Sequence, residues 1–194
     1  MVEPMRAGYT KYTYADVLDW PEDERWELID GVAYDMTPAP SRRHQEIIGA
    51  LHLQFGAFLR NSPCRVYLPP FDVRLPKPGE DGLTASTVVQ PDLTVICERE
   101  KLDDHGAVGS PALVIEVLSP STTRKDRDLK MTAFAQAGIP EYWIIAPGER
   151  TVEVYRLEEP GRYGTATTYL HNEQLPVGVL PELVIDLAPV FAEE

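Results

Sequence analysis

Residues 111–119 read PALVIEVLS, and the predicted fold is built around this segment. It is an apolar run rich in β-branched residues, and it carries one charged side chain, Glu116. Such a run is typical of a strand that is buried on both faces of a sheet. An ionised carboxylate is costly to bury unless it is paired or binds a metal ion. Glu116 therefore requires a cationic partner or a metal ion.

Helix and strand signals alternate on both sides of this strand. Helix patterns cover residues 41–60 and 125–137, and strand patterns cover residues 71–75, 88–97, 111–119 and 142–145. Ser41 is expected to cap the first helix, residues 119–123 (SPSTT) to lead into the second, and Gly138 to end it. The order predicts an α/β (α+β) fold, with a mixed central sheet flanked by helices. Tyr142 and Trp143 are interpreted as core residues.

Shorter elements are expected before and after this core. A short helix is expected after Thr13, and Asp30-Gly31 is a strong signal for a hairpin turn. Additional strands are expected at residues 26–29, 32–36, 152–155, 166–170 and 184–187, a linker at 38–40, and polar loops at 77–84 and 98–110. Because no linker is long enough to separate independent domains, we expect one domain over residues 1–194, with its core at about 41–147.

The charge of the chain is strongly acidic. Its 194 residues are 43% hydrophobic and carry a net charge of −13. This balance argues against general affinity for nucleic acid, which usually requires a basic surface. Basic residues nevertheless gather between Arg124 and Lys130. Such a run is usually a solvated helix face, and it would contact phosphate only if it flanks the carboxylates.

The sequence predicts a cytoplasmic protein with no membrane association. The first residues lack the apolar segment of a secretory signal, and no stretch approaches the roughly 20 apolar residues that span a bilayer. Cys64 and Cys97 form no CxxC pair, and the chain has no Cys/His pattern for structural zinc. We therefore expect both cysteines to remain reduced.

A second carboxylate precedes Glu116 in the chain. Asp92 follows Pro91 in the strand predicted at 88–97, and sequential strands are neighbours roughly two-thirds of the time. Two carboxylates from adjacent strands, with water and a backbone carbonyl, suit a hard cation such as Mg²⁺. A bound Mg²⁺ ion would point to phosphate chemistry.

Lys130 is the candidate for a cation in the same site. If Leu129, Ala133 and Ala137 face the sheet, Lys130 lies about 100° round the helix from them and could reach over the end of the strand.

Several motifs in this order resemble the Uma-two family, a group of predicted bacterial nucleases with the PD-(D/E)XK restriction-endonuclease-like fold. The motifs are WELIDG, SRRHQEI, QPDLTVI, IEVLSPST, DLKMTAFAQAG and EYWII, and the resemblance extends from about residue 14 to residue 147. It implies cleavage of DNA with Mg²⁺, for which Mn²⁺ can substitute. Asp92 and Glu116 would be the metal-binding carboxylates, helped by the carbonyl of Val117.

The sequence departs from the superfamily pattern at one position. The superfamily usually has a lysine two residues after the second acid, where this chain has Leu118. The resemblance therefore implies that Lys130 performs the function of that lysine. A polar residue of the first long helix, His44 or Glu46, would complete the site.

Glu27, in WELIDG, also matches a characteristic family position. The hairpin that contains Glu27 is expected at the edge of the site.

Each of these residues also has a structural interpretation. Glu116 could pair with a nearby arginine, Asp92 could be a turn residue, and Lys130 could be a solvated helix lysine. His44 could be a hydrogen-bonded residue at the start of its helix.

Two further acidic residues also have a structural interpretation. Glu27 could pair with Arg25 or Arg43, and Asp72 could point outward from its strand or border the site.

Two functions from different classes follow. The first is a metal-dependent endonuclease, for which a homodimer would suit cleavage of both DNA strands. The alternative is a catalytically inactive binding or regulatory module with a nuclease fold, favoured by the acidic charge and by Leu118. A two-carboxylate glycosidase is less favoured, because Lys130 would have no role in it.

Overall fold

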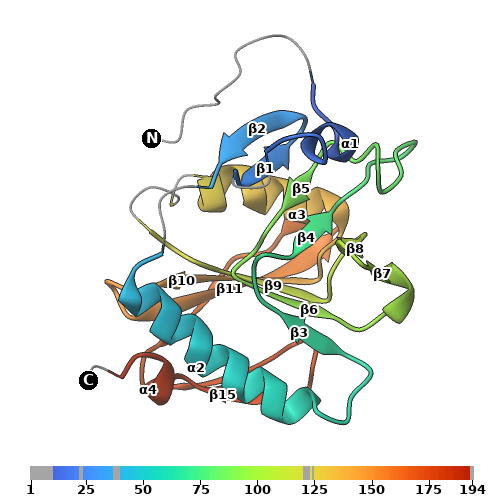
Figure 1. Ribbon diagram of the computed structural model, residues 1–194. Helices are drawn as coiled ribbons and strands as arrows, with labels where there is room; N and C mark the ends of the chain where they lie inside the picture. Colours follow the sequence, from blue (N-terminus) through green and yellow to red (C-terminus); the bar gives the residue numbers. More distant parts are fainter. Residues whose placement is uncertain (1–10, 22–23, 37–39, 120–122, 124, 193–194) are drawn as a thin grey trace.

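A computed structural model describes residues 11–21, 24–36, 40–119, 123 and 125–192 (Figure 1). The expected linker at Pro38-Ala39 and the expected capping residues Ser121 and Thr122 lie outside this part of the chain. None of the helices that the structure describes combines the length and the apolar character needed to cross a membrane.

The main sheet has seven strands, in the order β12-β11-β10-β9-β6-β3, with β13 also paired to β11. They are β3 (Arg65–Tyr67), β6 (Leu93–Ile96), β9 (Leu113–Val117), β10 (Glu141–Ala146), β11 (Thr151–Glu159), β12 (Arg162–Tyr163) and β13 (Thr167–Leu170). β9 and β10 are parallel and the other neighbours are antiparallel, so the sheet is mixed. Every residue of β9 and β10 is buried, and Tyr142 and Trp143 lie in the core as predicted.

The N-terminal hairpin forms the edge of a second, six-stranded sheet, in the order β2-β1-β5-β4-β8-β7. Its strands are β1 (Trp26–Ile29), β2 (Val32–Asp35), β4 (Asp72–Arg74), β5 (Val88–Val89), β7 (Leu102–Asp103) and β8 (Gly106–Val108). The mixed α/β class is confirmed, but the expectation of one central sheet is incomplete. β3 takes the position beside β6, and the loop expected at 98–110 contains β7, β8 and the 3-10 turn η1 (Arg99–Lys101).

Gln90-Pro91-Asp92 connects the two sheets. The sequence predicts one strand over residues 88–97, but β5 and β6 belong to different sheets. Pro91 has no backbone N–H and cannot donate to a strand ladder. The break places Asp92 where the chain passes from one sheet to the other.

Helices cover both faces of the main sheet (Figure 1). The apolar residues of α2 (Arg42–Leu59) share a core cluster with Ile115. On the opposite face, the apolar residues of α3 (Met131–Ala137) pack with Val114. Because successive strand residues face opposite sides, Glu116 faces the same side as Val114, toward the second helix.

The second helix begins with a π-helical segment, η2 (Lys125–Lys130), that continues into α3. The expectation that Leu129 faces the sheet is wrong, since Leu129 is 40% exposed and Lys130 is only 3% exposed. A π-helix bonds residue i to i+5, so it changes which residues point inward. Gly138 ends the helix with a φ of 77°, as predicted.

The remaining elements lie near the two ends of the described chain. They are α1 (Tyr14–Val17), the two-stranded sheet of β14 (Gln174–Pro176) and β15 (Val184–Asp186), and α4 (Leu187–Val190). Leu175, Ile185 and Leu187 join the core cluster that α2 forms with the main sheet.

Cys64 and Cys97 form a disulfide, which corrects the expectation that both remain reduced. They are separated by 33 residues, but β3 and β6 are antiparallel and place Arg65 opposite Ile96. Continuing this register places the two cysteines opposite each other at the strand ends. Spacing along the chain could not show this pairing, because it depends on strand adjacency.

Gly106 allows β8 to approach β4 closely. It pairs with Asp72, has a φ of 148°, and a Cβ at this position would lie 2.1 Å from the carbonyl oxygen of Asp72. We expect Gly106→Ala to lower the free energy of unfolding by about 2–4 kcal/mol, measured by urea denaturation.

Gly49 provides the matched control for this substitution. A Cβ on Gly49, within α2, meets no atom within 4 Å. Gly49→Ala should therefore be neutral or stabilising by about 0.5–1 kcal/mol. Equal stability of the two variants would contradict the close approach at Gly106.

Candidate active site

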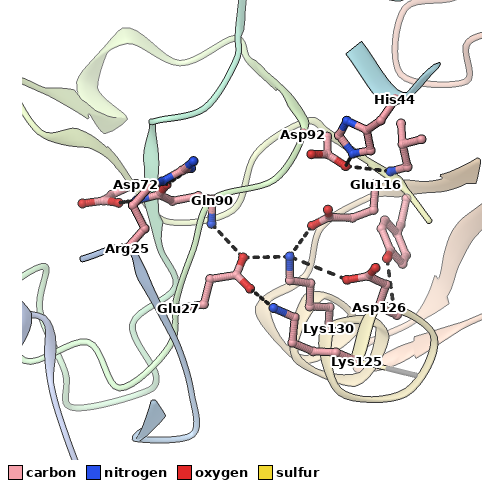
Figure 2. Close-up of polar contacts among 12 residues, drawn as sticks. Arg25, Glu27, His44, Asp72, Gln90, Asp92, Glu116, Lys125, Asp126 and Lys130 are labelled. Carbon is pink, nitrogen blue, oxygen red and sulfur yellow. Dashed lines mark hydrogen bonds and ion pairs between the residues drawn. The ribbon is translucent and has the colours of Figure 1, made fainter. Parts of the chain in front are cut away.

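The ends of β6 and β9 bring two carboxylates to one cavity. The register pairs Leu93 with Ile115, and its continuation places Asp92 opposite Glu116. Asp92 Oδ2 accepts a hydrogen bond of 2.8 Å from the backbone N–H of Val117, which holds this carboxylate against β9 (Figure 2). The side chains of Asp92 and Glu116 are 17% and 6% exposed.

Pro91 cannot offer a hydrogen-bond donor to the backbone carbonyl of Val117, which lies opposite it. The backbone N–H of Leu118 donates to the carbonyl of Ile145, so the N–H and C=O of Leu118 point toward β10. Because these groups point to opposite sides in successive strand residues, the N–H and C=O of Val117 point toward β6. The β6–β9 register continues with Pro91 opposite Val117. Because proline has no N–H, it cannot donate to the Val117 carbonyl. The proline before Asp92 thus removes a ladder donor beside both carboxylates.

Lys130 extends from η2 into the middle of the cluster. Its Nζ atom lies 2.6 Å from Glu116 Oε1 and 2.7 Å from Glu27 Oε1. Asp126 Oδ1 lies 3.8 Å from the same amine. Lys130 is therefore not a solvated helix lysine, and Glu116 is paired with a lysine and not with an arginine.

Glu27 comes to the cluster from β1 of the second sheet. Its side chain is fully buried and contacts Lys125 Nζ at 2.5 Å as well as Lys130. It also accepts a hydrogen bond from the backbone N–H of Gln90. The alternative interpretation, an ion pair with Arg25 or Arg43, is absent among the described contacts of Glu27, whose two cationic partners are the lysines of η2.

The protonation equilibria of the cluster follow from burial and charge. Burial alone would raise the pKa of Glu27, but the charges of Lys130 and Lys125 outweigh it and lower the pKa to about 2. Burial raises the pKa of Glu116 well above its ordinary value against the opposing effect of Lys130, and nearby carboxylates add to the increase. Burial would lower the pKa of Lys130, but Glu116, Glu27 and Asp126 outweigh it and raise it, so this lysine remains protonated.

Carboxylates outnumber ammonium groups in this cluster. The four acids are Glu27, Asp92, Glu116 and Asp126, and the two lysines are Lys125 and Lys130. With every group ionised, these six side chains have two excess negative charges. Such an excess in a buried position favours binding of a divalent cation.

Of the two candidates in α2, His44 reaches the site and Glu46 does not. His44 Nε2 lies 3.1 Å from Asp92 Oδ2, and Ser41 Oγ accepts from the backbone N–H of His44 at the start of the helix. Glu46 forms ion pairs with Arg42 and Arg43 outside the cavity.

Three site residues were not singled out from the sequence. In the sequence Lys125 is one member of a basic run, and no pattern distinguishes Asp126 or Gln90 from other polar residues. Lys125 and Lys130 are five residues apart, so in an ordinary α-helix they would point about 140° apart. The π-helical segment brings them to one side of the helix. The one sequence feature that points to Gln90 is its position directly before Pro91-Asp92.

Gln90 connects the cluster to the second sheet. Its Nε2 donates to Asp72 Oδ1 at 2.8 Å, and Tyr14 donates its hydroxyl proton to Asp72 Oδ2 at 3.0 Å. Asp72 is thus linked to the cavity by its contact with Gln90 and does not itself line it.

The acids and lysines of the cluster, together with His44 and Gln90, line a cavity of about 870 Å³. Both sheets contribute to its lining, together with α2, η2 and residues 147–149 after β10. Within the described ranges of the chain, no group of three or more His, Cys, Asp and Glu side chains has an arrangement that could hold a metal ion. A metal ion here would need a donor set of two carboxylates, a backbone carbonyl and water.

Comparisons with known proteins agree with this architecture. The Uma2 family, described as "Putative restriction endonuclease", matches residues 14–188. An uncharacterized protein of Synechocystis sp. is 25% identical over 158 residues, which are 80% of this chain and 79% of that protein.

A solved structure shares the fold. It is the crystal structure of a protein described as "a putative nuclease belonging to DUF820", from Anabaena variabilis ATCC 29413, with a TM-score of 0.72 at 20% identity. The match covers 93% of this chain and 97% of that one. The family match extends from α1 into α4, and the motifs predicted the same family, so the chain belongs to the Uma2 family of nuclease-like proteins.

Proposed function

We propose that the protein is a metal-dependent endonuclease that hydrolyses phosphodiester bonds of DNA. The observation that carries the proposal is the position of Lys130, whose amine contacts Glu116 in a cavity that Asp92 also lines. An acid pair at the ends of adjacent strands, with a nearby lysine, is the arrangement that the PD-(D/E)XK pattern requires. The family description of a restriction endonuclease supports this choice of reaction.

The residues present are compatible with Mg²⁺, and Mn²⁺ could substitute. Asp92 and Glu116 would hold the ion, with the Val117 carbonyl as a third oxygen donor that Pro91 cannot engage. With every group ionised, the two excess negative charges of the cluster would equal the charge of one such ion. When bound, a divalent ion activates water and stabilises negative charge on the phosphate.

Lys130 acts as a charged donor and not as a base. Its raised pKa keeps the amine protonated, so it can orient a water molecule or stabilise charge on a phosphate oxygen. It supplies from η2 the cation that Leu118 cannot supply from β9. His44 holds Asp92 in position, and Glu27 fixes Lys130 from the opposite side. Assembly as a homodimer and residence in the cytoplasm stay predictions from the sequence.

Removal of the Glu116 charge tests the reaction. We expect Glu116→Gln to lower cleavage of plasmid DNA in Mg²⁺ or Mn²⁺ by about 10²-fold or more, because it removes a proposed ligand without changing side-chain size. Glu182 is exposed and does not line the cavity, so Glu182→Gln should retain the wild-type rate. Wild-type protein that neither cleaves DNA nor binds Mn²⁺ in calorimetry would instead be a nuclease-fold binding module without turnover.

The two buried lysines allow a matched comparison. Both contact Glu27, but among the described contacts only Lys130 reaches Glu116. We expect Lys130→Met to lower the cleavage rate by about 10²–10³-fold. Lys125→Met should lower it much less, although both variants lose a buried ammonium group and some thermal stability. Equal loss of activity in the two variants would show that Lys130 has only a structural role.

A further inference from the structure

Arg25 differs from the other basic residues of the cavity in its partner. The arginine and lysine side chains that line the cavity in the described part of the chain are Arg25, Lys125, Arg127 and Lys130. Both lysines contact Glu27, and Arg127 forms a two-point ion pair with Glu153. Arg25 contacts the amide oxygen of Gln90, which is neutral. Its positive charge therefore has no carboxylate partner among the described contacts.

The backbone directs Arg25 to the same side as Glu27. Arg25 continues the pairing of the N-terminal hairpin, because its carbonyl accepts a hydrogen bond from the N–H of Met36. Alternate residues of a strand share a face, so Arg25 and Glu27 face one side while Trp26 packs into a core cluster on the other. Figure 2 shows Arg25 on the Gln90 side of the ion-pair cluster.

Gln90 also fixes the orientation of the guanidinium group. Its Oε1 atom accepts from Arg25 Nη2 at 2.5 Å and from Arg25 Nε at 3.2 Å. The amide itself is held by Asp72 through Nε2. A guanidinium group has five N–H donors, so the two bonds to Gln90 leave other donors for an anion. The arginine is exposed, so this remaining part is accessible from the cavity.

We propose that Arg25 is a phosphate-binding residue that holds the DNA backbone beside the carboxylates of Asp92 and Glu116. Guanidinium donors match the geometry of phosphate oxygens, and a phosphate would supply the negative charge that Arg25 lacks. The subsite rests on the proposed nuclease function and assigns Arg25 to substrate binding, separate from the metal-binding carboxylates. The net charge of the protein is −13, so its surface as a whole repels DNA. Arg25 would provide a positive charge at the cavity, where the DNA backbone must bind.

Fluorescence anisotropy with a short labelled DNA duplex tests this assignment. Measurements in the Glu116→Gln background without added metal ion keep hydrolysis negligible during the titration. Adding Arg25→Gln should weaken binding about tenfold and lower the slope of log K against log salt concentration by about one. Adding Arg162→Gln should change neither, because Arg162 is an exposed residue that pairs with Glu159 and does not line the cavity.

Two further measurements distinguish phosphate binding from a structural role. Arg25→Gln in the otherwise wild-type protein should bind Mn²⁺ in calorimetry as tightly as the wild type, whereas weakened Mn²⁺ binding would indicate that Arg25 positions the carboxylates. Arg25→Lys keeps the charge, so it should retain the salt slope with a smaller loss of affinity, and this holds even if the Gln variant is unstable. Unchanged affinity and slope in the Arg25 variants overturn the subsite alone, since DNA cleavage by the wild type tests the nuclease function independently.

Discussion

The ammonium group of Lys130 connects the two sheets at the base of the cavity. It contacts Glu116 of β9 in the main sheet and Glu27 of β1 in the second sheet. Removing one partner of a buried ion pair typically costs about 3–5 kcal/mol, because the remaining charge is left without compensation. The relative position of the acids in the site therefore depends on this lysine. The same group stabilises the fold and supplies the positive charge that the proposed reaction needs.

The break between β5 and β6 at Gln90-Pro91-Asp92 is a second connection between the two sheets. It lets one segment of chain serve both sheets, and it places Asp92 beside β9 while Gln90 holds Glu27 through its backbone N–H. Pro91 has no N–H, so the Val117 carbonyl opposite it receives no hydrogen bond from the strand ladder. The segment thus positions an acid, leaves a carbonyl oxygen available and orients Gln90 toward Arg25.

The sequence predicted the parts of this site that depend on local patterns. A charge within a buried strand pointed to Glu116, and strand order pointed to Asp92 as its neighbour. What it could not predict depends on contacts between distant segments or on irregular backbone. The division of residues 88–97 between two sheets, the disulfide of Cys64 with Cys97, and the inward position of Lys125 are of this kind. A π-helical segment has no simple sequence signature, so the side of η2 that faces the cavity could be found only from the structure.

The proposed reaction depends on a divalent cation that Asp92 and Glu116 hold beside Lys130. A crystal structure of the wild-type protein grown with Mn²⁺, with anomalous diffraction data, tests it most directly. We expect an anomalous peak at metal–oxygen distance from one oxygen of each carboxylate and from the Val117 carbonyl, with the Lys130 amine nearby. A well-ordered site with no anomalous density between the two carboxylates, or with the ion bound elsewhere, would contradict it.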